Sequence, residues 1–317
     1  MVTSVDSRTD RGSLPGDGGG PGGGLGTVAV LAHRRKTLGG GLAEMRSLLA
    51  EAGYPEPIWH EVSKSGKASK KARKALKDGA RLVFVWGGDG MVQRCVDALA
   101  GSGVVVAIVP AGTANLLATN LGIPPDLGEA VRIGLHGRRR RLDLGRINGE
   151  HFAVMAGAGF DGAMIRDAGR GLKDRLGRLA YVWTGLRHVT DAVRRVKIRV
   201  DGRIWFEGPA SCVLFGNVGT VTGGMRVFDE AVPDDGRLDV GVATADGAVQ
   251  WARTFGRIAA GRADRSPFVQ TTRASKVDVR LDTPTAYELD GGERDPVRRL
   301  KVRLVPGAIT VCVPDSA

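Results

Sequence analysis

The sequence predicts an α/β domain with a mostly parallel, doubly wound sheet, followed by an antiparallel β-sandwich or barrel. Short apolar runs alternate with amphipathic helical patterns up to about residue 141, and this β-α alternation is typical of parallel sheets. Two of these runs, 82–86 and 104–109, each end in a glycine-rich turn. Beyond residue 142 the chain becomes a series of short runs, many with period-two alternation, which predicts antiparallel strands.

Length and composition set the first limits. The chain of 317 residues is long enough for two ordinary domains, and residues 1–26, which contain a run of glycines, are expected to form a disordered tail. We expect a cytoplasmic or peripheral protein, because no apolar run has the length of a membrane span or the form of a signal peptide. The widely spaced Cys95, Cys212 and Cys312 are expected to be buried thiols in a reducing compartment.

The charge of the chain indicates an anionic partner. A net charge of +12 and a pI near 10.1 would attract nucleic acid, an anionic membrane surface or nucleotide phosphates. Aromatic residues make up 5% of the chain and do not alternate with the basic clusters, and no zinc-finger or RNA-recognition pattern is present. We therefore expect no nucleic-acid partner.

The first domain begins after the glycine-rich tail. Residues 27–32 and 58–62 are predicted strands, and a helix with Leu42, Met45, Leu48 and Leu49 on one face lies between them. The basic segment 64–77 is interpreted as the exposed face of a surface helix, with phosphate or membrane attraction as the alternative.

The second domain is predicted from short strands and two helical inserts. The predicted strands are 152–156, 197–200, 203–206, 210–216, 238–243, 276–281, 286–289 and 300–305. The first insert, 171–196, has a broad apolar face that suits either a helix covering the sheet or an interfacial helix. The second insert, 248–260, is a short amphipathic helix with no chemistry assigned to it.

The two glycine-rich turns carry the functional prediction. GGDG at 87–90 and PAGTAN at 110–115 each follow a buried strand and precede a helix, where backbone N–H groups can bind a phosphate chain. The expected ligand is therefore a nucleotide, although neither the Walker pattern nor GxGxxG is present. Asp89 either supports a magnesium ion beside the phosphates or caps the helix that follows it.

Three further segments, of which two are turns, place carboxylates where chemistry is conceivable. Asp143 follows an arginine run and could face the site or pair with Arg140 or Arg141. The turn that begins at Asp290 could supply a general base or be a simple hairpin. Asp235 lies in the other turn, whose backbone carbonyls could help it to hold a cation.

Taken together and in order, these segments resemble the catalytic family of diacylglycerol kinases, which includes bacterial lipid kinases and sphingosine kinases. The matching segments are LVFVWGGDG, VAIVPAGTANLLATNLGIP, RRLDLGRINGEHFAVMAGAGFDGAMI, GNVG with GGM, AVPDDGRLDV and ELDGGE. The resemblance covers nearly all of 27–314. It implies an NAD kinase/phosphofructokinase-like α/β domain at 27–141 plus 305–317, a lipid-acceptor β-sandwich at 142–304, and a last strand that returns to the first domain.

The resemblance also implies an activity and the residues that perform it. The activity is transfer of phosphate from Mg-ATP to a lipid hydroxyl, with diacylglycerol as the default acceptor. Asp89 and Asp143 would support the magnesium of ATP, Asp290 would belong to the general-base turn, and Glu293 is the next carboxylate along. A structural magnesium would be bound by Val232, Asp235 and Arg237. The residues implied to line the nucleotide are Gly87, Gly88, Asp89, Gly90, Met91, Val92, Gln93, Arg94, Gly112, Thr113 and Asn115.

The chain departs from the family pattern on both sides of the expected site. Met91 stands where the family commonly has Thr, Arg94 where it has Glu, and Leu116 where it often has Asp. In the base turn, Gly292 displaces the second carboxylate to Glu293. Either Asp290 suffices, or Glu293 reaches back through an altered loop, or catalysis is impaired.

Two alternatives to a lipid kinase remain open at this point. One is a catalytically weak nucleotide-binding regulator, and the other is a kinase for a soluble acceptor such as NAD. For a lipid kinase, the expected partner is a lipid substrate at an anionic membrane surface, with the protein peripherally associated there. The oligomeric state, including a homodimer, is left open.

Overall fold

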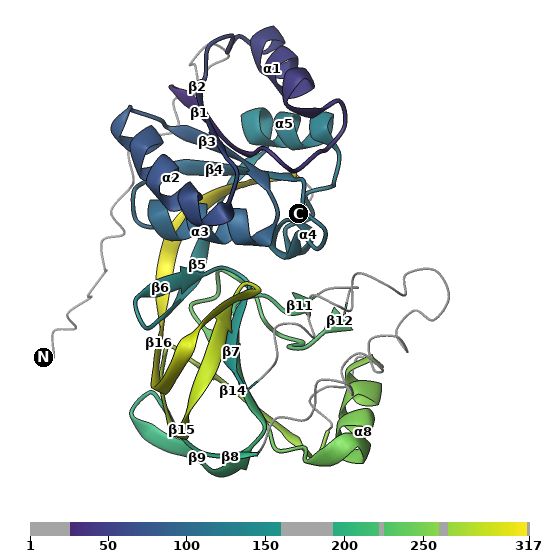
Figure 1. Ribbon diagram of the computed structural model, residues 1–317, viewed down its shortest axis with the longest axis vertical. Helices are drawn as coiled ribbons and strands as arrows, with labels where there is room; N and C mark the ends of the chain where they lie inside the picture. Colours follow the sequence, from purple (N-terminus) through teal and green to yellow (C-terminus); the bar gives the residue numbers. More distant parts are fainter. Residues whose placement is uncertain (1–25, 160–192, 222–224, 260–265, 316–317) are drawn as a thin grey trace, which may run out of the picture.

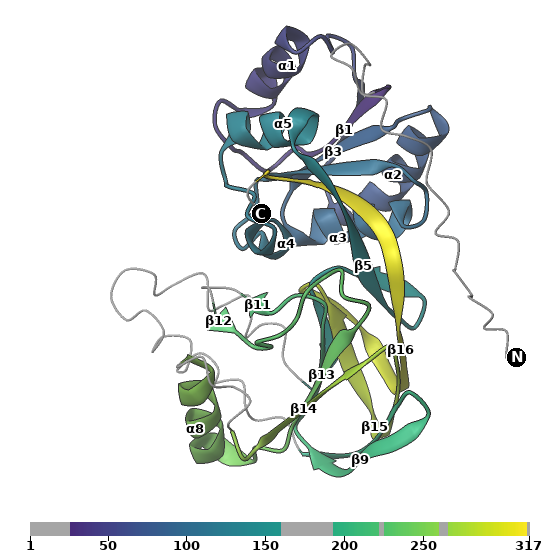
Figure 2. The same cartoon turned by 180° about the vertical axis from the view of Figure 1, so that it is seen from behind.

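The computed structural model describes residues 26–159, 193–221, 225–259 and 266–315. It has an α/β domain and a β-sandwich domain, joined by two long strands (Figures 1 and 2). The predicted fold class is confirmed.

The α/β domain is built on four parallel strands in the order β4-β3-β1-β2. Helices α2 and α3 pack together on one face of the sheet, and α1 and α5 pack together on the other (Figures 1 and 2). Because both faces are covered, β1, β3 and β4 are almost continuously apolar. The elements are β1 (Val28–His33), α1 (Gly41–Glu51), β2 (Ile58–Val62), the 3₁₀ helix η1 (Ser65–Lys67), α2 (Ala68–Lys77), β3 (Leu82–Gly87), α3 (Asp89–Leu99), β4 (Val105–Pro110), α4 (Leu116–Asn120) and α5 (Leu127–His136).

The sandwich domain consists of antiparallel strands in the order β14-β13-β10-β7-β15-β16, with β8 pairing with β15 and with β9. Alternate residues of these strands face a second buried cluster, as the period-two pattern predicts. The elements are β5 (Arg138–Ile147), β6 (Glu150–Phe152), β7 (Met155–Ala158), β8 (Arg194–Val200), β9 (Arg203–Ala210), β10 (Cys212–Gly216), β11 (Thr220–Val221), β12 (Met225–Arg226), β13 (Leu238–Ala243), α8 (Gly247–Ala259), β14 (Val269–Ala274), β15 (Lys276–Leu289) and β16 (Gly292–Val313).

Strands β5 and β16 belong to both domains. The first part of β16 pairs with β15, and its end pairs in parallel with β4 through Thr310 and Val105. Strand β5 runs antiparallel to β16 through both parts, with a register shift between Val305 and Ile309. The last strand therefore returns to the first domain, as expected, and the predicted junction at 141/142 lies inside β5.

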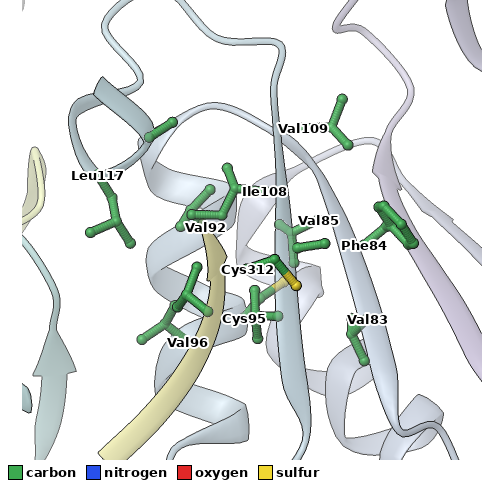
Figure 3. Packing of buried hydrophobic residues seen from close by; sticks show 14 of the residues in the cluster. Val83, Phe84, Val85, Val92, Cys95, Val96, Ile108, Val109, Leu117 and Cys312 are labelled. Atoms are coloured by element: carbon green, nitrogen blue, oxygen red, sulfur yellow. The ribbon is translucent and has the colours of Figure 1, made fainter. Parts of the chain in front are cut away.

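The α/β core includes side chains from both ends of the sequence. Cys312 of β16 belongs to the same buried cluster as Val83 and Phe84 of β3 (Figure 3). Cys95, Cys212 and Cys312 are all buried and form no disulfide, as their wide spacing in the sequence predicted.

Several sequence-based boundaries need correction. The predicted helix 171–196 lies mostly outside the described residues, but its last residues, from Arg194, form the start of β8, because Val196 pairs with Leu281 of β15. The arginines from Arg138 onward begin β5, and the two predicted strands 276–281 and 286–289 are one irregular strand, β15. The second helical insert is confirmed as α8.

Candidate active site

The two glycine-rich turns touch each other through their backbones. A Cβ atom on Gly112 would lie 2.4 Å from the Cα of Gly88, so neither position has room for a larger residue without movement. The N–H of Ala111 also donates to the carbonyl of Gly87 at 3.0 Å. The ends of β3 and β4 therefore form one surface of closely packed backbone.

The side chain of Asp89 ties these turns together. Its carboxylate accepts the N–H of Asn115 at 3.0 Å and the N–H of Leu116 at 2.5 Å, so it caps α4. It is not the N-cap of its own helix, α3, whose cap position is Gly88. Burial raises the pKa of Asp89, and the two amides partly oppose that shift.

The second turn is held in shape by its own asparagine. Asn115 has a left-handed backbone, with φ 49°. Its side chain accepts the N–H of Gly112 at 2.8 Å and donates to the carbonyls of Pro110 and Gly112. Thr113 is exposed at the tip of this turn. The asparagine amide is thus used within the turn, and the threonine hydroxyl is the side-chain group available at its tip.

The residues after GGDG face the protein interior. Met91, Val92 and Gln93 are buried, and the Gln93 amide donates to the carbonyl of His151 at 2.8 Å. The N–H groups of Met91 and Val92 also donate inward, to the carbonyl of Gly88, so the structure offers neither their side chains nor these N–H groups for the predicted contact with a nucleotide. It stays a prediction, as it does for Gly87 and Gly90.

Helix α3 is fastened to the sandwich domain by an ion-pair network that sequence reasoning missed. Glu150 of β6 binds Arg294 of β16 through both carboxylate oxygens and also accepts from Arg94 of α3 at 3.1 Å. Asp97 of α3 accepts the backbone N–H of His151 and contacts its ring, both at 2.9 Å. The hydrogen bond from Arg294 lowers the pKa of Glu150. We call these five residues the α3–β6 clamp. Arg94, which stands where the family commonly has Glu, was the one feature of the sequence that indicated an acidic partner for this helix.

Asp290 occupies a type of hairpin turn that its sequence favours. Asp290 and Gly291 have φ values of 45° and 78°, as a two-residue type I′ turn requires. The carboxylate is 5% exposed and accepts three backbone N–H groups at 2.8 to 2.9 Å, from Ala153, Val154 and Met155. We call these three N–H groups the amide cradle.

The electrostatic environment of Asp290 matches that of a proton acceptor. Burial raises the pKa of Asp290 to about 6, the amide cradle opposes the shift, and the charge of Asp89 adds to it. The structure therefore brings these two predicted site residues, from different domains, within electrostatic reach of each other.

Glu293 is placed differently from Asp290. It is exposed on β16, directly opposite Glu288 of β15, while Gly292 pairs with Leu289. A Cβ atom on Gly292 would approach the Arg294 guanidinium to 3.0 Å, the far end of a flexible side chain. A carboxylate could therefore be accommodated at residue 292, and a catalytic role for Glu293 stays a prediction.

Asp143, within β5, joins the loop before β13 to the irregular part of β16 instead of pairing with the neighbouring arginines. Its carboxylate accepts the N–H of Gly236 at 2.8 Å and the N–H of Gly307 at 2.7 Å. Arg140 instead pairs with Asp234, and Arg141 donates to the carbonyl of Gly307.

Asn217, in the GNVG segment, connects Asp143 to the amide cradle. Its amide nitrogen donates to the carbonyls of Asp143 and Ala153 at 2.9 and 3.0 Å. The side chain is 1% exposed, and its Oδ1 has no hydrogen-bond partner among the residues that the structure describes. A buried, unpaired oxygen beside two candidate site residues marks Asn217 as a residue that sequence reasoning left without a role.

The oxygen ligands available at Asp89 and Asp143 suit a hard cation such as magnesium, and backbone amides fix both carboxylates.

The predicted structural metal loop around Asp235 fits a metal ion less well. The Asp235 carboxylate accepts the N–H of Arg237 at 2.9 Å and binds the Arg273 guanidinium, which already neutralises it. Within the described ranges no three metal-binding side chains cluster together. Both magnesium assignments stay predictions.

Comparison with known proteins accounts for both domains. Residues 35–147 match the family model "Diacylglycerol kinase catalytic domain", and residues 154–313 match "YegS C-terminal NAD kinase beta sandwich-like domain".

Individual relatives extend over most of the chain. A probable YegS-like lipid kinase of Pseudomonas aeruginosa is 31% identical over 305 residues, which cover 90% of this chain and 94% of the relative. The diacylglycerol kinase of Bacillus subtilis is 28% identical, covering 79% and 83%. A crystal structure of a putative diacylglycerol kinase from Bacillus anthracis shares the fold, with a TM-score of 0.76 at 23% identity over 92% of this chain and 98% of that one. The chain therefore belongs to the family of diacylglycerol kinases and YegS-like lipid kinases.

Proposed function

We propose that this lipid kinase transfers the γ-phosphate of ATP to the free hydroxyl of diacylglycerol and produces phosphatidic acid. The observation that carries the proposal is Asp290, a buried carboxylate with a raised pKa, close enough to Asp89 at the glycine-rich turns for their charges to interact. The acceptor is inferred from the Bacillus subtilis relative, which is named diacylglycerol kinase.

The proposed reaction is a single displacement at phosphorus. The lipid hydroxyl oxygen forms a bond to the γ-phosphorus, the bond from that phosphorus to the bridging oxygen breaks, and ADP leaves. The hydroxyl proton goes to the Asp290 carboxylate. A carboxyl group with a pKa of about 6 is a stronger base than a surface aspartate and is still mostly ionised near neutral pH.

The glycine-rich turns and the two amide-bound carboxylates supply positioning and charge. The first turn would present its backbone to the phosphate chain, and the exposed Thr113 at the tip of the second turn would present its hydroxyl, since the N–H of Gly112 is already bonded to Asn115. Asp89 and Asp143 would hold a magnesium ion, whose charge neutralises the phosphates when it is bound. Phosphoryl transfer depends mainly on such positioning and charge neutralisation.

The proposal includes peripheral association with an anionic membrane surface, where the acceptor resides. In the part of the chain that the structure describes, no helix has the length and apolarity needed to cross a bilayer. A net charge of +12 supports attraction to anionic lipid.

The direct test presents the purified protein with γ-labelled ATP, magnesium and diacylglycerol in neutral detergent micelles. We expect labelled phosphatidic acid, and we expect the Asp290→Asn variant to be inactive, because Asn-Gly keeps the type I′ turn but lacks the proton acceptor. Folded protein that does not label diacylglycerol in this assay would overturn the proposal.

A catalytically weak nucleotide-binding regulator remains the second candidate, favoured by the exposed position of Glu293 and by Gly292 in the base turn. Tight binding of ATP without transfer to any acceptor would support this regulator.

An arm of the same kinase assay with NAD and no lipid tests the alternative of a soluble acceptor. The Glu293→Gln variant tests whether Glu293 takes part in catalysis, because this variant should keep its activity if Asp290 alone suffices as the base.

A further inference from the structure

The outer face of the sandwich sheet formed by β9, β8, β15, β16 and β5 is strongly basic. Along these strands the apolar residues face the buried cluster, and the residues between them point to the other face of the sheet. We call this surface, with its cations, the basic sheet face. Its cations are Arg146, Lys197, Arg199, Lys276, Arg280, Arg299, Lys301 and Arg303.

Like charges face each other directly across the strands. Arg303 of β16 lies opposite Lys276 of β15 on one side and opposite Arg146 of β5 on the other. Arg280 of β15 lies opposite both Arg299 of β16 and Lys197 of β8. Directly opposed like charges destabilise a sheet, so this arrangement costs the fold stability while no anion is bound.

Acidic side chains compensate only part of this charge. Asp278 binds Arg299, and Glu207 binds Lys197 at 2.7 Å. The other exposed cations form no ion pair with any residue in the described ranges; these are Arg199, Lys276, Arg280, Lys301 and Arg303. Part of the surface is hollowed into a groove of about 800 Å³, whose charged lining residues are Arg146, Lys276, Lys301, Arg303 and the Asp278–Arg299 pair.

We propose that the basic sheet face docks onto the anionic phospholipid headgroups of a bilayer. The inference rests on the proposed function, because a diacylglycerol acceptor lies in the membrane. The cations are spread over several strands and all but the half-buried Arg146 and Lys197 are exposed, which suits an extended anionic surface better than a single small anion. Near an anionic membrane each Lys or Arg contributes about 1 kcal/mol.

Two further features favour a bilayer over nucleic acid. The groove has no aromatic side chain in its lining, so it offers no platform on which bases could stack. Ile204 of β9 is 54% exposed and lies directly opposite Arg199 on β8, so both side chains belong to the same face. An exposed apolar side chain at the edge of a basic surface is suited to insertion among headgroups.

The test is co-sedimentation of the full chain with vesicles of phosphatidylglycerol and phosphatidylcholine, compared with vesicles of phosphatidylcholine alone. The triple variant Lys276→Gln, Lys301→Gln, Arg303→Gln should bind the anionic vesicles about a hundredfold more weakly. Its melting temperature should equal or exceed that of the original protein, because like-charge pairs are removed. The matched control, Lys64→Gln, Lys70→Gln, Lys77→Gln, loses the same charge from the region of η1 and α2 and should keep its binding.

Additional arms identify the partner and separate this inference from the proposed function. Ile204→Ser should weaken vesicle binding by several-fold without changing net charge. Equal binding by the triple variant, an equal loss in the control, or capture of inorganic triphosphate or nucleic acid in place of vesicles would overturn the inference. Kinase activity of the triple variant on diacylglycerol in neutral detergent micelles should be unchanged. Failure of the original protein in that micelle assay overturns the proposed function instead.

Discussion

At the scale of single residues, the environment of Asp290 makes activity depend on pH. The pKa of Asp290 is raised to about 6, chiefly by burial, and only the ionised carboxylate can accept the hydroxyl proton. We therefore expect kcat/KM for the lipid acceptor to be constant above about pH 7 and to fall about tenfold per pH unit below pH 6. A pH-rate profile in micelles checks this.

The loss of activity at low pH can be distinguished from a loss of stability at low pH. Because the native pKa of Asp290 lies above its ordinary value of 3.8, the folded protein binds this proton more tightly than the unfolded chain does. The contribution of Asp290 to stability therefore declines as the pH rises from about 4 to about 6, opposite in direction to the activity. A profile without a break near pH 6, in protein that remains folded, would remove Asp290 from the role of base.

Gly112 allows a second test at this scale. In Gly112→Ala the new Cβ would lie 2.4 Å from the backbone of Gly88, so the two turns must separate. We expect ATP to bind at least about tenfold more weakly, a loss of about 1.4 kcal/mol, as measured by calorimetry. Gly256→Ala is the matched control, since its Cβ in helix α8 meets nothing within 4 Å. Unchanged affinity in Gly112→Ala would show that the contact between the turns does not shape the nucleotide site.

At the scale of elements, the α3–β6 clamp joins the helix that follows the first glycine-rich turn to the strand that follows the base turn. Glu150→Gln removes the charge that holds both Arg94 and Arg294. We expect kcat to fall about tenfold with little change in the KM for ATP, because Glu150 orients the two halves of the site through Arg94 and Arg294 and is not itself among the residues predicted to line the nucleotide.

Two variants control this experiment. Glu150→Asp keeps the charge and should restore part of the activity. Glu129→Gln breaks an exposed pair with Arg132 on α5 and should have no effect on kcat. An equal change in kcat for Glu129→Gln and Glu150→Gln would show that the clamp has no positioning role.

The loop between β12 and β13 permits a test of the structural metal. Asp235 is neutralised by Arg273 of β14, which also lies opposite Asp239 of β13. We expect chelation to leave the melting temperature of the nucleotide-free protein unchanged, and we expect magnesium to stabilise Arg273→Gln, in which the carboxylate is left without its cation. Scanning fluorimetry with EDTA and with magnesium measures both. A clear drop in the melting temperature of the original protein with EDTA would restore the metal assignment.

At the scale of the whole molecule, local patterns predicted the α/β alternation, the sandwich strands and the turns that contain Asp89 and Asp290. They could not predict which groups these carboxylates bind. The Asp290 carboxylate accepts the N–H of Ala153, and Glu150 pairs with Arg294. In both cases most of the sandwich-domain sequence separates the two partners. Such pairings depend on topology, which periodicity in one sequence does not encode. Asp89 shows the same limit, since it caps α4 and not the helix that follows it in the chain.

The path of β16 through both domains has a consequence for how the protein is made. The N-terminal domain cannot complete its sheet until β16 arrives, because Val311, Cys312 and Val313 are fully buried in its core beside β4. During synthesis, β16 leaves the ribosome after every other described strand. The parallel pairing of Val105 with Thr310 closes a very long stretch of chain, and contacts of this kind slow folding. The two domains are therefore expected to reach their native state together, in one late step, and not one after the other during translation.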